Sequence, residues 1–113
     1  MGDYETLCEI VEKIELGSSC IETSDNVYCA AYSKGLFGCK IIAKTASGKE
    51  IKRINRDGLV VIGNLHQVVL FSENGIEYVA DADSPEKVYE IEQYKVKCFP
   101  DSKDVIFLEM EES

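Results

Sequence analysis

The sequence predicts an α+β fold, with an N-terminal amphipathic helix packed on a mainly antiparallel β-sheet or partial barrel of six to eight strands. Two observations support this class. Apolar residues recur first at helical spacing and then with a period of two, and turn signals follow one another too closely for crossover helices. A length of 113 residues suits one domain, so we expect a single domain over 1–113.

The first element is predicted to be a helix over about 3–16. Apolar residues recur at i, i+3, i+4 and i+7 from Leu7, which places four of them on one helical face. Asp3 is the expected N-cap, and Gly17 fits the position just past the C-terminus. This helix is therefore expected to lie on an apolar surface.

A β-meander is predicted over about 26–110, with a frayed tail at 111–113. Asn74-Gly75 is the strongest hairpin signal, because both residues tolerate positive φ. Ser84-Pro85 suits the start of a short helical turn, whereas 87–92 fits neither element well. The expected strands are 26–32, 39–45, 50–55, 59–62, 67–72, 76–80, 94–99 and 105–110.

Two runs of four apolar residues, 59–62 and 68–71, show no polar alternation. Strands covered on both faces have this pattern, so both runs are expected at the centre of the sheet, under the helix. Neither run approaches the length of about 18 residues that a membrane-spanning helix needs, and the N-terminus lacks the apolar stretch of a signal peptide. We therefore expect a cytoplasmic protein without a membrane partner.

The formal net charge of −9 is unevenly distributed along the chain. Residues 1–25 carry seven acids and one base, whereas residues 26–56 carry seven bases and one acid. The overall negative charge argues against direct binding of duplex nucleic acid. The basic segment leaves open a site for a small anion such as a nucleotide, unless acidic elements neutralise it. The candidate anion-binding residues are Lys40, Lys44, Lys52, Arg53 and Arg56.

The acidic face of the first helix is the complementary candidate, as a surface that docks on a basic partner, with solubility as the simpler explanation. Exposed tyrosines often anchor interfaces, although core packing explains them equally well. The candidate partner-binding residues are Glu5, Glu9, Glu12, Tyr28 and Tyr32.

Catalytic signatures are scarce in the sequence. No nucleophile-elbow, zinc-protease or phosphate-loop motif is present. His66 is the only histidine, so a Cys-His arrangement has to use it, and Cys20 is the best candidate for a reactive thiol. Asp81 and Asp83 are weak candidates for a divalent cation and fit equally well as residues that end a strand. No cofactor is expected.

Five cysteines are an odd number, so we expect reduced thiols rather than a complete disulfide framework. The first functional hypothesis is a small acidic non-enzymatic inhibitor or adaptor, of the kind that phages direct against nucleic-acid-handling host systems. The alternative is a binder of a small anionic ligand on the hairpin 34–56, and an enzyme of unknown class is third. Unpaired strand edges also allow a homodimer.

Overall fold

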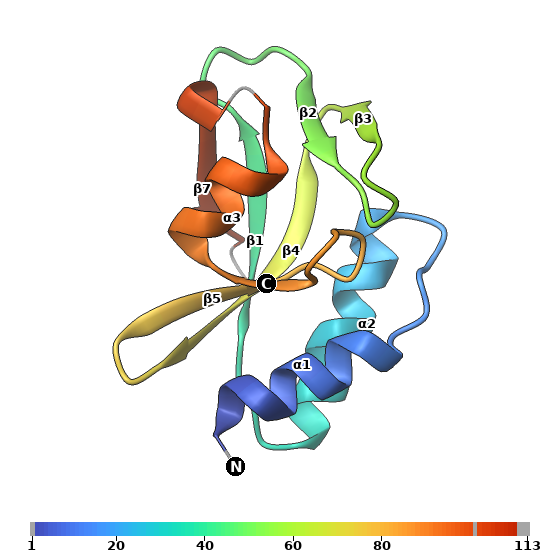
Figure 1. Cartoon of the computed structure of the whole chain (residues 1–113), viewed down its shortest axis with the longest axis vertical. Coiled ribbons are helices and arrows are strands. Elements are labelled where there is room, and N and C mark those ends of the chain that lie inside the picture. Colours follow the sequence, from blue (N-terminus) through green and yellow to red (C-terminus); the bar gives the residue numbers. More distant parts are fainter. Residues whose placement is uncertain (1, 101, 111–113) are drawn as a thin grey trace.

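The structure is a computed structural model that describes residues 2–100 and 102–110. The α+β class is confirmed, since the described residues form helices and a mainly antiparallel sheet that is not closed into a barrel. One sheet has the order β6-β5-β4-β1-β7, and β2 and β3 form a separate hairpin sheet (Figure 1). The elements are α1 (Asp3–Lys13), α2 (Cys20–Ser33), β1 (Cys39–Thr45), β2 (Ile51–Ile54), β3 (Val60–Gly63), β4 (His66–Glu73), β5 (Ile76–Ala80), β6 (Val88–Glu90), α3 (Ile91–Cys98), a 3-10 turn (Ser102–Asp104) and β7 (Val105–Glu109).

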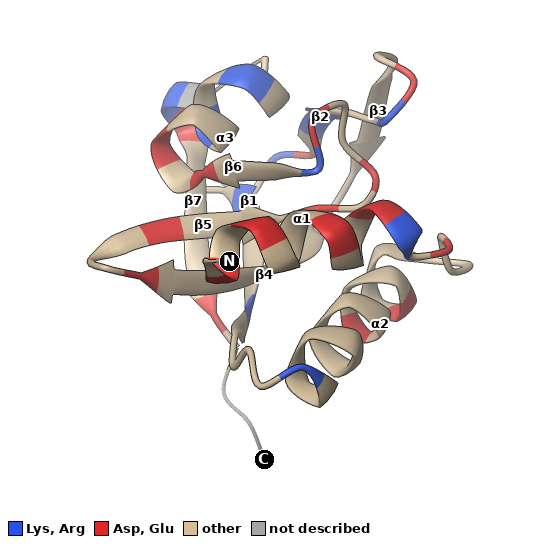
Figure 2. Cartoon of the chain, turned by 60° about the horizontal axis from the view of Figure 1, so that its bottom comes forward, with Lys and Arg blue, Asp and Glu red and all other residues tan. Residues whose placement is uncertain are grey.

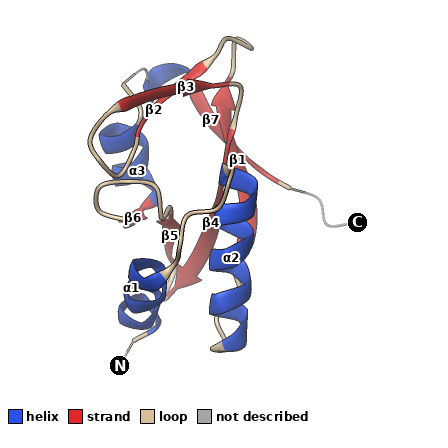
Figure 3. Ribbon diagram, turned by 90° about the vertical axis from the view of Figure 1, so that its right-hand side faces the viewer, coloured by secondary structure: helices blue, strands red, loops and turns tan. Residues whose placement is uncertain are grey.

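The five-stranded sheet is covered on both faces (Figures 1 and 3). Along β4, Val68 and Leu70 pack in the core that α3 completes, whereas Val69 and Phe71 pack in the core beneath α1 and α2. This alternation follows from the period of two along a strand, because successive side chains point to opposite faces. The apolar run 68–71 is therefore central and buried on both sides, as predicted.

The second apolar run differs from the prediction. Leu59, Val60 and Ile62 are 63%, 55% and 57% exposed, on a hairpin that projects from the body of the fold. An apolar run predicts burial, but β3 pairs only with β2 among the described residues, so no second layer covers its outer face.

Helix α1 confirms the predicted N-terminal helix, although it ends at Lys13 rather than near residue 16. Leu7 and Val11 are its buried residues. Asp3 is not the N-cap, because Gly2 holds that position and contributes no side-chain cap. Instead, the carboxylate of Glu73 on β4 accepts the backbone N–H groups of Asp3 and Tyr4, at 3.2 and 2.8 Å.

The prediction of a first strand at 26–32 is wrong, because α2 covers Cys20–Ser33. Ser19 is its N-cap, and the Ser19 hydroxyl accepts the N–H of Glu22 at 3.2 Å. Val27 and Ala31, four residues apart, bury one face of α2 against the sheet. Burial of these residues at helical spacing therefore outweighs the preference of tyrosine and valine for strands, and the segment is a helix.

The predicted strand at 94–99 is also wrong, because α3 covers Ile91–Cys98, with Tyr94 and Cys98 buried at i and i+4. The segment 87–92 contains β6 and the start of α3, and Ser84-Pro85 begins no helix. The last strand is confirmed as β7, but it pairs with β1 rather than with the segment before it. The predicted frayed tail at 111–113 lies outside the described residues.

Candidate cysteine–histidine–aspartate site

Cys20 occupies the first position of α2, where the sequence predicted loop. Its side chain is half-buried and lines a hollow of about 180 Å³ together with His66 and Arg53. The backbone N–H groups of a first helical turn have no acceptor within the helix, and the helix dipole places partial positive charge there. Both effects favour a negative charge on the Cys20 thiol or on a group next to the first turn of α2.

His66 begins β4, and its ring is buried. Its Nε2 lies 2.9 Å from Oδ2 of Asp81, which follows the end of β5. On the solvent side, Cys20 and His66 line the same hollow, and their interaction lowers the pKa of the Cys20 thiol and raises that of His66. The order is therefore thiol, imidazole and carboxylate.

The Asp81 carboxylate accepts further hydrogen bonds. The hydroxyl of Tyr94 donates to Oδ2 at 2.7 Å, and the N–H of Asp83 donates to Oδ1 at 3.0 Å. The backbone N–H of Asp81 donates to the carbonyl of Lys87 at 2.7 Å. A buried carboxylate with this many donors stays ionised and fixed in position.

The charges of the three groups reinforce one another. Burial opposes protonation of His66, but the charge of Asp81 and the hydrogen bonds to Asp81 and Cys20 prevail and raise its pKa to about 9. The hydrogen bond from His66 lowers the pKa of the Cys20 thiol more than its burial raises it. For Asp81, burial favours the neutral acid, yet the contact with His66 still lowers the pKa. An imidazolium paired with the Asp81 carboxylate is the favoured state, and its charge favours ionisation of the Cys20 thiol.

Tyr94 remains a hydrogen-bond donor within this network. Burial and the adjacent charge of Asp81 raise the pKa of its phenol well above the ordinary value, so the hydroxyl keeps its proton. Tyr94 itself is fully buried on α3. The site thus draws its components from α2, β4, the segment after β5, and α3.

Arg53 forms the wall of the hollow on the side of β2. Its guanidinium donates to Oδ2 of Asp83 at 2.9 Å and to the backbone carbonyl of Asp83 at 3.2 Å. Its side chain is 16% exposed. The positive charge of Arg53 also lowers the pKa of Cys20. Arg53 therefore connects the projecting hairpin to the site.

The other candidate cations lie elsewhere. Lys40 pairs with Asp25 of α2 at 2.6 Å. Lys52 lines a separate hollow beside Thr45, together with Glu50 and Asp104. Lys44 and Arg56 line neither of these hollows. Of the five predicted anion-binding residues, the structure brings only Arg53 to the cysteine.

The candidate partner-binding residues lie on the two N-terminal helices. Glu5, Glu9 and Glu12 are exposed along α1 (Figure 2). Tyr28 and Tyr32 lie one turn apart on α2 rather than on a strand, with ring centroids 6.3 Å apart. Tyr32 is exposed, and Lys40 Nζ lies 5.1 Å from the centroid of the Tyr28 ring.

Asp81 and Asp83, the weak metal candidates, have other contacts: Asp81 with His66 and Asp83 with Arg53. Within residues 2–100 and 102–110, no group of three or more acidic, histidine or cysteine side chains is arranged to hold a metal ion. Cys8, Cys20, Cys29 and Cys98 carry free thiols. No helix in the described part of the chain is long and apolar enough to cross a membrane.

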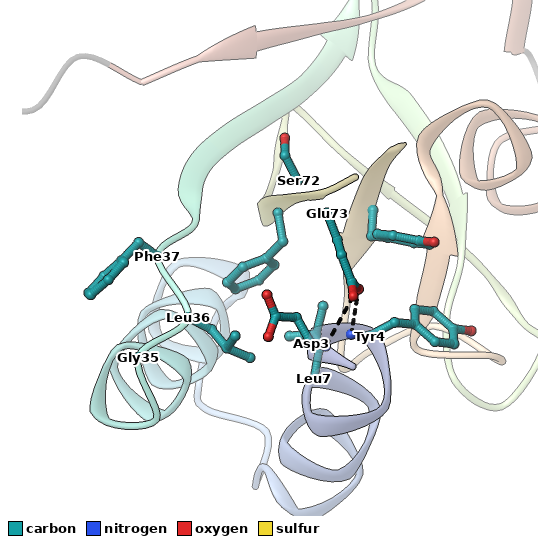
Figure 4. A pocket seen from close by; sticks show the side chains of 10 residues that line it. Asp3, Tyr4, Leu7, Gly35, Leu36, Phe37, Ser72 and Glu73 are labelled. Atoms are coloured by element: carbon teal, nitrogen blue, oxygen red, sulfur yellow. Dashed lines mark hydrogen bonds between the residues drawn. The ribbon is translucent and has the colours of Figure 1, made fainter. Parts of the chain in front are cut away.

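A separate hollow of about 210 Å³ lies at the N-terminus of α1 (Figure 4). Aromatic rings and Leu7 line it, and the Glu73 carboxylate points to the first turn of the helix. Because that carboxylate already accepts the N–H groups of Asp3 and Tyr4, we interpret it as the cap of α1.

Cys20 and His66 were the two residues that the sequence singled out for reactivity, but the role of Asp81 with them was missed. One sequence signal bears on the position of Cys20. Ser19-Cys20-Ile21-Glu22 fits the capping-box pattern, which marks a helix start and places Cys20 in its first turn. No local signal pairs Asp81 with His66, because the contact depends on the pairing of β4 with β5.

No protein-family model matches the chain, and no curated protein shows significant sequence similarity to it. The geometry of the site is therefore the basis for assigning a function.

Proposed function

We propose that this protein is an enzyme that uses the Cys20 thiolate for acyl transfer, with hydrolysis of an amide or ester as its simplest overall reaction. The observation that carries the proposal is the order Cys20, His66 and Asp81: Cys20 and His66 line one hollow at the start of a helix, and the buried Asp81 contacts the ring of His66. A thiol, an adjacent base and a residue that orients the base are the three parts of an activated nucleophile.

In the proposed reaction, the Cys20 thiolate attacks the carbonyl carbon of the substrate and forms a C–S bond. The electrons of the carbonyl double bond move to oxygen, and N–H groups of the first turn of α2, which have no acceptor within the helix, are the proposed donors to this oxyanion. As the oxyanion collapses, the C–N or C–O bond breaks and the His66 imidazolium gives its proton to the leaving group.

Water completes the cycle. Neutral His66 takes a proton from water as the oxygen attacks the thioester carbon, and the C–S bond then breaks. This releases a carboxylic acid and restores the thiolate–imidazolium pair. Asp81 keeps the ring in one orientation throughout and stabilises its charge, through the contact at Nε2.

The test uses p-nitrophenyl acetate, a small activated ester that needs little recognition. We expect a burst of p-nitrophenol, acetylation that maps to Cys20, and a slower steady release governed by hydrolysis of the thioester. Cys20→Ala should abolish the burst, and His66→Gln should reduce its rate by about 10²–10⁴-fold. Cys29→Ala, which removes an exposed thiol from the same helix, is the matched control and should change neither phase.

Acetylation spread equally over Cys20 and the exposed Cys29 would overturn the proposal. So would a burst that does not depend on His66. Circular dichroism of each variant confirms that a lost burst reflects lost chemistry rather than lost folding.

The sequence-based hypothesis of a non-enzymatic acidic inhibitor or adaptor stays a prediction. Glu5, Glu9 and Glu12 are solvent-exposed, which such a docking surface requires. Replacing all three with Gln should slow association with a basic partner in a salt-dependent way and leave acetylation of Cys20 unchanged. The two functions are therefore separable by mutation.

A further inference from the structure

The β2–β3 hairpin has an apolar strand edge beside the cysteine. Among the described residues β3 pairs with β2 alone, and it lies outside β2 in Figure 1. Natural proteins usually protect such edges with charge, proline or a covering element, because exposed strand edges recruit other chains. An apolar, unprotected edge therefore indicates a surface that is used for binding.

The hydrogen bonding of the hairpin shows which groups face outward. The N–H of Asn55 donates to the carbonyl of Leu59 at 2.8 Å, and Arg53 pairs opposite Val61. Hydrogen-bonded and non-hydrogen-bonded pairs alternate in an antiparallel ladder. Val60 and Ile62 therefore belong to the non-hydrogen-bonded pairs, and direct their N–H and C=O groups away from β2.

The same edge leads into the candidate site. A hollow of about 130 Å³ is lined by residues of both hairpin strands, among them Val61, Ile62 and Gly63 of β3, and by Leu65, Cys20 and His66. This hollow shares Cys20, His66 and Arg53 with the hollow described above. A chain paired with β3 would therefore have its next residues at the thiol.

From these observations we infer that the substrate is an extended polypeptide segment, which adds to the outer edge of β3 as a further strand and thereby brings a carbonyl group to Cys20. This inference rests on the proposed function and names its substrate class. Main-chain hydrogen bonds to Val60 and Ile62 supply affinity, and the exposed side chains of the hairpin select apolar residues in the segment.

The test measures the rate at which Cys20 is alkylated by chloroacetamide groups, with and without an attached peptide. One pool of octapeptides carries the chloroacetyl group at its amino end, and a second carries it on the last side chain. At least one pool is expected to react about tenfold faster than chloroacetamide alone, because pairing on β3 holds the reactive group at the thiol.

Ile62→Pro is the decisive variant. It removes an N–H that faces away from β2, so the hairpin keeps its own ladder, but the added strand loses a hydrogen bond. We expect the rate of the peptides to fall to within about twofold of the rate of chloroacetamide measured on the same variant. Glu109→Pro is the matched control: it lies on the edge strand β7, where the N–H of Met110 donates to Lys40, so the Glu109 N–H also faces outward.

The outcomes separate the two proposals. If Cys20 reacts with chloroacetamide no faster than Cys29 does, the proposed function fails. If Cys20 is reactive but neither pool gains over chloroacetamide, or Glu109→Pro removes the gain as fully as Ile62→Pro does, the substrate inference alone is overturned. A dimer that Ile62→Pro dissociates would also overturn it, by assigning the edge to a second copy of the chain.

Discussion

The Asp81 carboxylate connects three groups that come from different parts of the chain: the His66 ring, the Tyr94 hydroxyl and the backbone N–H of Asp83. It is 4% exposed. A buried charge is tolerated only when it is paired and hydrogen-bonded, and removal of one partner leaves the others uncompensated. Single substitutions around this carboxylate therefore test the structure of the site directly.

Tyr94→Phe removes one donor from Asp81 and leaves the aromatic packing in place. We expect it to lower the free energy of unfolding by about 1–3 kcal/mol, the usual cost of an unsatisfied buried acceptor. Urea denaturation measures the change. Tyr32→Phe, on an exposed ring, is the control and should stay within about 0.5 kcal/mol of the parent protein. Equal losses in both variants would refute the role given to Tyr94.

The raised pKa of His66 also predicts how stability depends on pH. Folding raises this pKa from 6.5 to about 9, so the contribution of the protonated ring is complete below pH 6.5 and is lost as the pH rises to about 9. Cys20 and Arg53 also interact with this ring. The lowered pKa of Cys20 has the opposite effect on stability, because its contribution is lost as the pH falls.

Urea denaturation across this range, in a Cys20→Ser background, isolates the histidine. The free energy of unfolding should fall between pH 6.5 and 9 relative to the same background with His66→Gln. A constant difference between the two proteins over this range would contradict the ion pair of His66 with Asp81.

At the scale of elements, the start of α2 positions the thiol. Ser19→Ala removes the side-chain acceptor for the N–H of Glu22, and should destabilise the protein by about 1 kcal/mol and slow alkylation of Cys20 as the first turn frays. Ser33→Ala is the matched control at the other end of α2, where the Ser33 hydroxyl donates to the carbonyl of Ala30. If Ser33→Ala slowed alkylation of Cys20 as much as Ser19→Ala does, loss of the N-cap would not explain the slower alkylation.

Local signals predicted α1 and the strands β1 to β5 well, because each has a clear period or an adjacent turn. They failed for α2 and α3, where tyrosine and valine favour strands, but burial of Val27 with Ala31 and of Tyr94 with Cys98 favours helices. Only part of the site could be predicted from the sequence, because local patterns do not show which distant residues meet. Cys20 and His66 are recognisable as residue types, whereas Asp81 joins them only through the folded sheet.

At the scale of the whole molecule, a single sheet is shared by two cores. Leu70 packs toward α3 and Phe71 toward α1 and α2, although they are neighbours on β4. The site takes residues from both sides, since Cys20 comes from α2 and Tyr94 from α3. The two cores should therefore lose their structure together.

Leu70→Ala and Phe71→Ala should each lower the free energy of unfolding by about 2–5 kcal/mol while leaving one cooperative transition. Circular dichroism and the alkylation of buried Cys98 report on secondary structure and on the α3 core respectively. Their urea midpoints should coincide in both variants. Separate midpoints would show that the two faces of the sheet unfold independently.

The most direct test of the central claim is the rate of Cys20 alkylation by iodoacetamide as a function of pH, resolved by peptide mapping. The thiolate–imidazolium pair predicts a midpoint below the ordinary pKa of a thiol, and a shift of that midpoint to higher pH in His66→Gln. A midpoint at the ordinary value, unchanged in His66→Gln, would contradict the assignment of Cys20, His66 and Asp81 as a nucleophilic site.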